Sequence, residues 1–258
     1  MARPWLRLGG PLVLLAAVAL GALPALRAYW RVRESNPVQR GAAIAARSGC
    51  LSCHGPHGTR GLPDPNSGEQ VPAWDGGVPM MYVRDAQEVR EYILDGVSKR
   101  RAVIPKAEAE RLRAAIQMPG YRDVLTAREV DEVIAYFMAA SQMAPIADAA
   151  AARGRELVRH HGCEACHGIG GSGGVPNPGS LKGYVPGWLG PDFLDLVRDD
   201  EELKQWIVEG RIDRLLASRL ARHFLSGQRL QMPSYRSALS PDDTAAIVDY
   251  IHGLRKER

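Results

Sequence analysis

The chain has 258 residues, of which 45% are hydrophobic and 6% aromatic, and this allows one or two globular domains with ordinary cores. The formal net charge of +4 is modest and no basic motif is interleaved with aromatic residues, so the composition argues against nucleic-acid binding. Periodic segments rich in Ala, Leu, Arg and Glu favour helices, and runs typical of strands are scarce.

The first element in chain order is an uncharged stretch from Leu8 to Leu26, preceded by Arg3 and Arg7. Its 19 positions approach the roughly 20 that cross a bilayer as a helix. A cleaved export signal is the alternative, but its apolar region usually spans about 7–15 residues. The longer run favours a retained membrane anchor within residues 1–34. The positive-inside rule does not fix its orientation, because arginines also follow the run, at Arg27, Arg31 and Arg33.

A five-residue pattern, C-x-x-C-H, then occurs twice, at Cys50–His54 and Cys163–His167. Two thiols at this spacing can each bond one vinyl group of a porphyrin, and the next residue can offer an imidazole nitrogen to the iron. A shared zinc site, a redox dithiol and a plain disulfide are alternatives, but none of them needs the histidine. The pattern predicts two covalently bound haem c groups, held by Cys50, Cys53, His54, Cys163, Cys166 and His167.

Both motifs belong to an internal repeat with an offset of 113 to 114 residues. Several segments match in unchanged order, among them Val71–Trp74 with Val185–Trp188 and Met118–Arg122 with Met232–Arg236. Such a match indicates two copies of one helical domain. The expected boundaries are 35–143 and 144–258, since helical periodicity lapses just before the second range.

Each copy is expected to contain the same helices and the same loop. The first helix should cover about 37–48 and 149–160, and small residues at Gly41 and Gly154 would let the last helix cross it closely. A middle helix follows, carrying an apolar face in both copies. The last helix should begin with a capping box, Thr126 to Glu129 and Ser240 to Asp243. Segments 55–77 and 168–190 are rich in Gly and Pro and should form loops around the haem edge.

From about Asn36 onward the chain resembles a tandem dihaem cytochrome c, and each half is similar to the class I single-haem fold. The resemblance implies an all-α fold class, two tandem class I cytochrome c domains preceded by an N-terminal transmembrane helix. It also implies haem attachment on the outer side of a bacterial inner membrane. We therefore expect the haem domains to be periplasmic.

The resemblance further implies a methionine as sixth iron ligand, supplied by a loop ahead of the last helix. Met118 and Met232 lie 64 and 65 residues after His54 and His167, and each precedes a proline. The alternative is a methionine that fills a gap in the core. The expected iron ligands are thus His54, Met118, His167 and Met232.

Two further pairs of residues are candidates for contacts around the haem. The resemblance implies that a proline carbonyl accepts the second ring N–H of each ligand histidine, and Pro65 and Pro178 each lie eleven residues after theirs. Trp74 and Trp188 match each other in the repeat. They could donate an indole N–H to a haem propionate or simply pack against the porphyrin.

The function expected from these features is transfer of single electrons between respiratory redox partners, with no catalytic residues. The chain could be a free-standing carrier or the cytochrome subunit of a larger membrane complex. A dihaem peroxidase with one open haem site is the alternative, and it requires acid and base groups near that site. Basic stretches precede both methionine loops. They are either solvated helix faces or a surface that steers an acidic partner.

Overall fold

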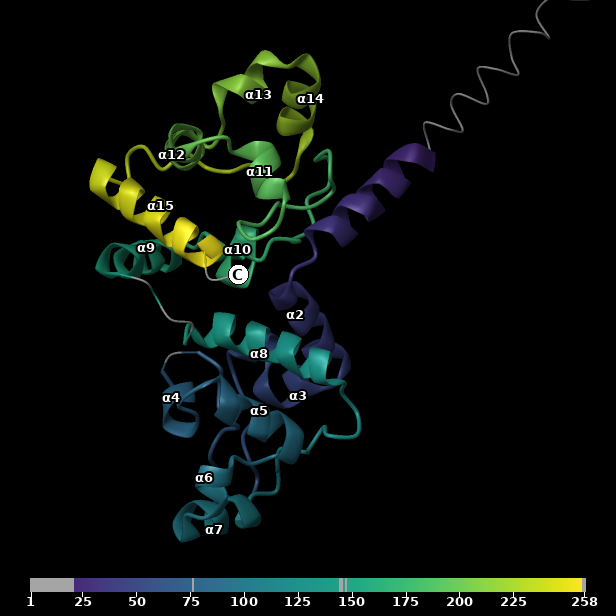
Figure 1. Ribbon diagram of the computed structural model, residues 1–258, viewed down its shortest axis with the longest axis vertical. Coiled ribbons are helices and arrows are strands. Elements are labelled where there is room, and N and C mark those ends of the chain that lie inside the picture. Colours follow the sequence, from purple (N-terminus) through teal and green to yellow (C-terminus); the bar gives the residue numbers. More distant parts are fainter. Residues whose placement is uncertain (1–20, 76, 144–145, 147, 257–258) are drawn as a thin grey trace, which may run out of the picture.

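The computed structural model describes residues 21–75, 77–143, 146 and 148–256, and it is built from helices joined by long loops (Figure 1). The first half contains α2 (Pro37–Arg47), α3 (Cys50–His54), α4 (Pro79–Tyr82), α5 (Ala86–Asp95), α6 (Lys99–Ala102), α7 (Pro105–Arg113) and α8 (Ala127–Ser141). The second half contains α9 (Ala149–His160), α10 (Glu164–His167), α11 (Asp192–Leu196), α12 (Asp200–Glu209), α13 (Asp213–Ala217), α14 (Arg219–Gly227) and α15 (Pro241–Lys256).

The first and last helices of each half cross in close contact, α2 with α8 and α9 with α15 (Figure 1). A Cβ added at Gly41 would lie 1.8 Å from the carbonyl oxygen of Glu132, and one added at Gly154 would lie 1.9 Å from that of Ala246. Only glycine lets the backbones approach this far. The predicted close crossing of the helices is therefore confirmed.

Side chains fix where these helices begin. Asn36 accepts a hydrogen bond from the Gln39 N–H (3.1 Å) and so caps α2. The predicted capping box is present at the start of α8, where Thr126 and Glu129 each satisfy the other's backbone N–H. Its counterpart precedes α15, because the Ser240 N–H donates to Asp243 and the Asp243 N–H to Ser240, both at 3.1 Å.

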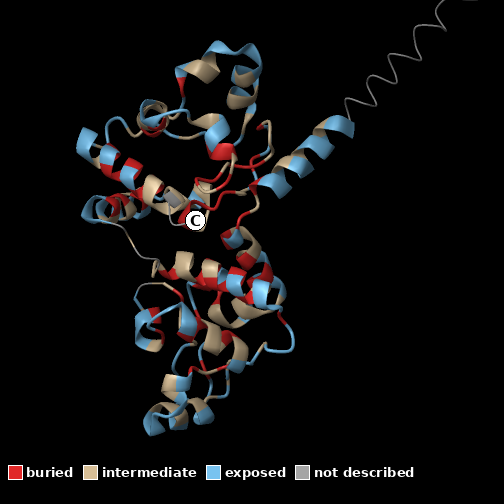
Figure 2. Ribbon diagram, viewed as in Figure 1, coloured by how far each residue is buried: buried red, intermediate tan, exposed pale blue. Residues whose placement is uncertain are grey.

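Each half has its own hydrophobic core (Figure 2). The core of the first half joins α2, α5 and α8, and the core of the second joins α9, α12 and α15. The predicted loops at 55–77 and 168–190 contribute Trp74 and Trp188 to these cores. Each contains one short 3₁₀ turn, η1 (Pro56–Gly58) or η2 (Ile169–Gly171). The loops carry isolated β-bridges, between Pro63 and Gln70 and between Pro176 and Tyr184.

The expected transmembrane helix is not found among the described residues. Most of the apolar run, residues 8–20, lies outside the described residues. Residues 21–34 are helical, but this part carries Arg27, Arg31, Arg33 and Glu34. Among the helices that the structure describes, none combines the length and the apolar character needed to cross a bilayer.

The described part of this helix instead contacts the second half. Arg27 donates hydrogen bonds to the carbonyl oxygens of Ser180 (2.9 Å) and Leu181 (3.0 Å). The start of α2 makes a similar contact, because Asn36 and Gln39 both donate to the carbonyl oxygen of Ser172 at 2.7 Å. The helix at 21–34 and the start of α2 thus both bind the 168–190 loop of the second half.

Candidate functional site

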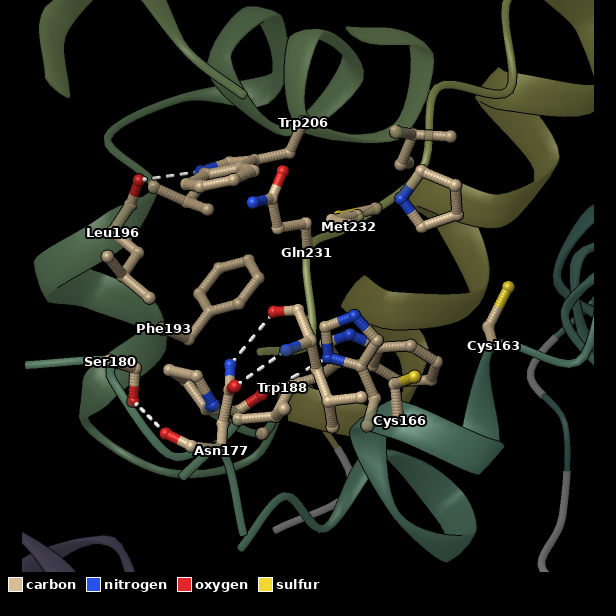
Figure 3. Close-up of a pocket in the computed structure, with 18 of the residues that line it drawn as sticks. Cys163, Cys166, Asn177, Ser180, Trp188, Phe193, Leu196, Trp206, Gln231 and Met232 are labelled. Atoms are coloured by element: carbon tan, nitrogen blue, oxygen red, sulfur yellow. Dashed lines mark hydrogen bonds between the residues drawn. The ribbon is translucent and has the colours of Figure 1, made fainter. Parts of the chain in front are cut away.

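A cavity of about 340 Å³ in the second half gathers the predicted ligands (Figure 3). Cys163, Cys166, His167 and Met232 all line it, although 65 residues separate the histidine from the methionine. Figure 3 shows Met232 on the side of the cavity away from Cys166 and Trp188. The remaining wall is mostly apolar, with side chains that include Phe193, Leu203, Trp206, Ile207, Phe224 and Leu225.

These donors fit a covalently attached haem. Two thiols, an imidazole and a thioether border one apolar space, and this is the donor set that a His/Met haem c requires. The thiols are not paired in a disulfide. Cys50 and Cys163 belong to different cores, so the four cysteines do not meet at one zinc ion. No cluster of three or more metal-binding His, Cys, Asp or Glu side chains occurs within the described ranges.

The ring orientation of both motif histidines is fixed by a backbone carbonyl. His54 Nδ1 lies 2.8 Å from the carbonyl oxygen of Pro72, and His167 Nδ1 lies 3.1 Å from that of Pro186. A ring nitrogen that donates to a carbonyl leaves the other, Nε2, as the lone-pair donor for a metal. Burial lowers the pKa of both imidazoles, which favours the neutral form that ligates.

The carbonyl acceptors expected at Pro65 and Pro178 are corrected by these contacts. Pro65 is exposed. The carbonyl oxygen of Pro178 accepts the Arg229 N–H instead, at 2.9 Å. The residue just before each of these prolines explains the difference, because it holds its loop to the methionine loop. Asp64 accepts the Ile116 N–H at 2.7 Å, and Asn177 accepts the Leu230 N–H at 2.8 Å.

The two tryptophans pack against the motif histidines. The ring centroids of Trp74 and His54 are 5.1 Å apart, and those of Trp188 and His167 are 5.2 Å apart. Both indoles are 7% exposed. A Cβ at Gly58 or Gly171 would lie within 2.6 Å of the indole, so glycine is required where each loop passes behind its tryptophan. These contacts place the indoles beside the motif histidines, and both packing against a porphyrin and a bond to a propionate stay predictions.

Each methionine loop is fastened to the rest of its half in the same way. Tyr121 and Tyr235 follow the methionines by three residues, and their hydroxyls donate to the carbonyl oxygens of Ser48 (3.1 Å) and His161 (3.4 Å). These acceptors lie two residues before the first cysteine of each motif. On the other side, the carbonyl oxygens of the methionines face Gly96 and Gly210, where a Cβ would approach within 2.3 Å. The loop that carries the expected sixth ligand is therefore anchored by the tyrosine hydroxyl and packs closely against the glycine that follows α5 or α12.

Several of these positioning residues escaped sequence reasoning, although the repeat contained a signal for them. Asp64 and Asn177 are related by the offset of 113 residues, and Pro72 and Pro186 by that of 114. A systematic comparison of the two copies at these offsets, including positions with different residue types, would have singled out both pairs.

The basic stretches divide into structural and exposed arginines. Arg100 forms a two-pronged ion pair with Glu88, and Arg214 forms its counterpart with Glu202 at 2.6 and 2.8 Å. Both arginines also donate to a backbone carbonyl oxygen, that of Tyr82 or Leu196. The exposed arginines in the second stretch have no acidic partner within the part of the chain that the structure describes: Arg211, Arg219, Arg222 and Arg229.

Comparison with known proteins gives a family match within the second half. Residues 149–251 match the family model described as cytochrome C oxidase, cbb3-type, subunit III. Among curated proteins, none matches the chain. The family match does not extend over the first half, so the expected fold class of two tandem class I domains is corrected to one detected cytochrome domain. That domain contains the cavity with Cys163, Cys166, His167 and Met232. The chain is thus similar to c-type cytochromes that carry covalently bound haem and transfer electrons.

Proposed function

We propose that the chain is a dihaem c-type cytochrome that passes single electrons between respiratory redox partners. The observation that carries the proposal is the convergence of Cys163, Cys166, His167 and Met232 on one apolar cavity. When bound, each haem supplies an iron that accepts and releases one electron. The cysteines would hold the group, and the imidazole and the thioether would both serve as ligands to its iron, which would leave no position for a substrate.

The first half supplies the second site in this proposal. Cys50 and Met118 pack against the same core, and the His54 imidazole is oriented as in the second half. Tyr121 holds the Met118 loop to the start of the C-x-x-C-H motif. These contacts repeat those of the second half one by one. They support one haem in residues 35–143 and one in residues 144–258.

The proposed place of action is the outer side of a bacterial inner membrane, beside a respiratory oxidase. The family that matches the second half is named for a subunit of such an oxidase, and this name supports a partner of that kind. The proposal leaves the chain as an electron-transferring subunit or carrier with no catalytic residues of its own.

A basic surface next to the second cavity is the proposed docking site for an acidic partner. Ala221, Phe224 and Leu225 on the inner side of α14 line the cavity, whereas Arg219 and Arg222 on its outer side are exposed. Positive charge at this position would attract an acidic protein to the edge of the bound haem.

Haem content and the near-infrared spectrum test the proposal. The purified holoprotein should carry two covalent haems per chain, and Cys163→Ala with Cys166→Ala should remove one of them. In the oxidised protein both irons should show the weak charge-transfer band of methionine–iron ligation. One haem per chain would contradict the dihaem proposal. A high-spin haem that reacts with peroxide would favour the peroxidase alternative instead.

A further inference from the structure

The ligand histidine of the second half is connected to a buried carboxylate through one peptide group. His167 Nδ1 lies 3.1 Å from the carbonyl oxygen of Pro186. The N–H of the same peptide, on Gly187, donates to Glu34 Oε1 at 3.1 Å. Glu34 is 1% exposed, and its other oxygen accepts the Asp192 N–H at 3.0 Å. The carboxylate comes from the helix at 21–34, outside both haem-binding halves.

The place for this carboxylate is built into the second half. A Cβ at Gly190 would lie 2.3 Å from the carboxyl group of Glu34, so the glycine leaves room for the carboxylate in its present place. Ionisable groups from several elements surround it: Asp192 on α11, Lys182 and the neutral Tyr184 on the preceding loop, and Arg255 on α15. Lys182 and Tyr184 both contact Asp192, at 2.6 and 2.8 Å. Burial, with a further contribution from Asp192, raises the pKa of Glu34 to about 7.

Among the described residues, the first half shows no such connection. Its ligand histidine uses the peptide between Pro72 and Ala73 in the same way. No acceptor for the Ala73 N–H is found among the residues that the structure describes. The two candidate haem sites therefore share their ligands and differ in what lies behind the histidine.

We infer that Glu34 is a positioning residue that lowers the reduction potential of the second haem relative to the first and takes up a proton when that haem is reduced. This inference rests on the proposed function. An anionic acceptor on the N–H of a peptide polarises the whole group and makes its carbonyl oxygen a stronger acceptor. A stronger acceptor at Nδ1 raises the basicity of the imidazole, and a more basic ligand stabilises ferric iron more than ferrous iron.

The coupled step balances in charge and atoms. The redox partner gives one electron to the ferric site, and water gives one proton to the Glu34 carboxylate. Re-oxidation sends the electron to the next partner and returns the proton to water. Because the carboxylate stabilises the oxidised site, its proton affinity must rise on reduction by the same free energy. A tenfold rise corresponds to about 59 mV for one electron.

Potentials of both haems measured across a pH range centred near 7 test the inference. In the wild type the second-haem potential should fall with rising pH, by up to about 59 mV per pH unit for one proton and one electron. The first haem in the same molecule is the internal reference. Glu34→Gln should abolish the fall and raise the second-haem potential at high pH. The assignment of the two potentials comes from the variant that lacks Cys163 and Cys166.

Two further variants separate this pathway from a general effect of charge. Asp195→Asn removes an exposed carboxylate that pairs with Arg33 and Lys182, and it should leave the pH-dependent fall in place. Asp192→Asn removes the negative neighbour of Glu34, so the fall should move to lower pH. This second variant also tests the inference if Glu34→Gln does not fold.

Different results would contradict the proposed dihaem function and the proposed role of Glu34. A second site without haem, or without methionine ligation, would overturn the proposed function. Two intact His/Met haems whose potentials follow pH in parallel would overturn the role of Glu34 alone. A pH-dependent fall that persists in Glu34→Gln would overturn it equally, because another group would then bind the proton.

Discussion

At the scale of single residues, Met232 carries the sharpest prediction about the chemistry of the second site. Met232→Ala removes the only thioether among the described residues that line this cavity. We expect about half of the near-infrared methionine–iron band to disappear and the second-haem potential to fall by on the order of 0.1–0.3 V, within the ~0.8 V that axial ligands span. Spectroelectrochemical titration measures both quantities.

Met80→Ala is the matched control for this change, because the Met80 side chain belongs to the first half and is 68% exposed. It should leave both potentials and the band unchanged. An unaltered spectrum in Met232→Ala would mean that the thioether fills the core and does not ligate.

The sequence predicts some residues of the site but not others. The C-x-x-C-H motif names its residues directly, because the covalent chemistry requires fixed spacing. The carbonyl acceptor behind each histidine depends on the path of a glycine-rich loop. Gly55 and Gly168 turn this loop with φ of +80° and +75°, so distance along the sequence does not tell which proline returns to the histidine. The sequence therefore favours Pro65 and Pro178 as carbonyl acceptors, whereas the loop brings Pro72 and Pro186 to the histidines.

At the scale of elements, the crossing of α9 and α15 should be intolerant of a single methyl group. Gly154→Ala places a Cβ 1.9 Å from the Ala246 carbonyl oxygen and 2.8 Å from Tyr250 Cβ, and backbone must move to accept it. We expect the free energy of unfolding to fall by about 3 kcal/mol, at the upper end of the usual cost of overpacking. Chemical denaturation of the holoprotein measures this.

The control for Gly154 lies on α15 itself. A Cβ at Gly253 would meet nothing within 4 Å. Gly253→Ala should therefore stabilise the helix by about 0.5–1 kcal/mol through the ordinary preference for alanine. Equal effects of the two substitutions would contradict the close crossing.

The ion pair between α12 and α13 predicts a specific response to acid. Hydrogen bonds from Arg214 are the main cause that lowers the pKa of Glu202 from 4.5 to about 2. Since the folded-state pKa lies below the unfolded one, this stabilisation is present above pH 4.5 and is lost as the pH falls toward 2. Glu202→Gln should lower the free energy of unfolding at neutral pH. Between pH 4.5 and 2 the variant should lose less of this free energy than the wild type, as measured by chemical denaturation at each pH.

Glu201→Gln is the neighbouring control, because the Glu201 side chain is 83% exposed and pairs only with Lys204 among the described residues. Its effect on stability should stay within about 0.5 kcal/mol at every pH. A wild-type acid response that Glu202→Gln reproduces in full would show that other carboxylates cause it.

The elements themselves were the most predictable part of the fold. The range expected for the first helix of the second copy, 149–160, is that of α9, since apolar periodicity and the cap at Asp148 act locally. The short helices α6, α7, α13 and α14 were not predicted individually. Two of them, α6 and α13, carry Arg100 and Arg214, whose ion pairs with Glu88 and Glu202 local periodicity does not reveal.

At the scale of the whole molecule, hydrogen bonds between residues far apart in the sequence join the segment before and at the start of α2 to the second half. Sequence periodicity over a few residues does not predict such bonds. Asn36, Gln39 and Glu34 reach the second half across more than 130 residues of sequence. The same segment was expected to be part of a membrane anchor or to follow it, because a run of apolar residues was the only signal. Its polar side chains find their partners in the tertiary structure, which the repeat alone could not reveal.

Exposed positive charge around α14 should control the rate of electron transfer to charged partners. Arg219, Arg222 and Arg229 are exposed around α14, whose inner side lines the second cavity. Replacing all three by Gln should slow reduction of ferricyanide, an anionic acceptor, on the order of tenfold at low ionic strength. The difference should vanish near 1 M salt, where the screening length is about 3 Å.

Two controls test whether the effect comes from the charge around α14: an electron acceptor that is a cation, and substitution of an arginine far from the cavity. Oxidation by a hexaammine complex should be unchanged or faster in the triple variant, because the repulsion is removed. Arg153→Gln removes one positive charge from the same half, at an ion pair with Asp243 away from the cavity, and should leave the ferricyanide rate nearly unchanged. Rates that depend only on net charge, or that do not respond to salt in the wild type, would show that α14 does not steer the partner.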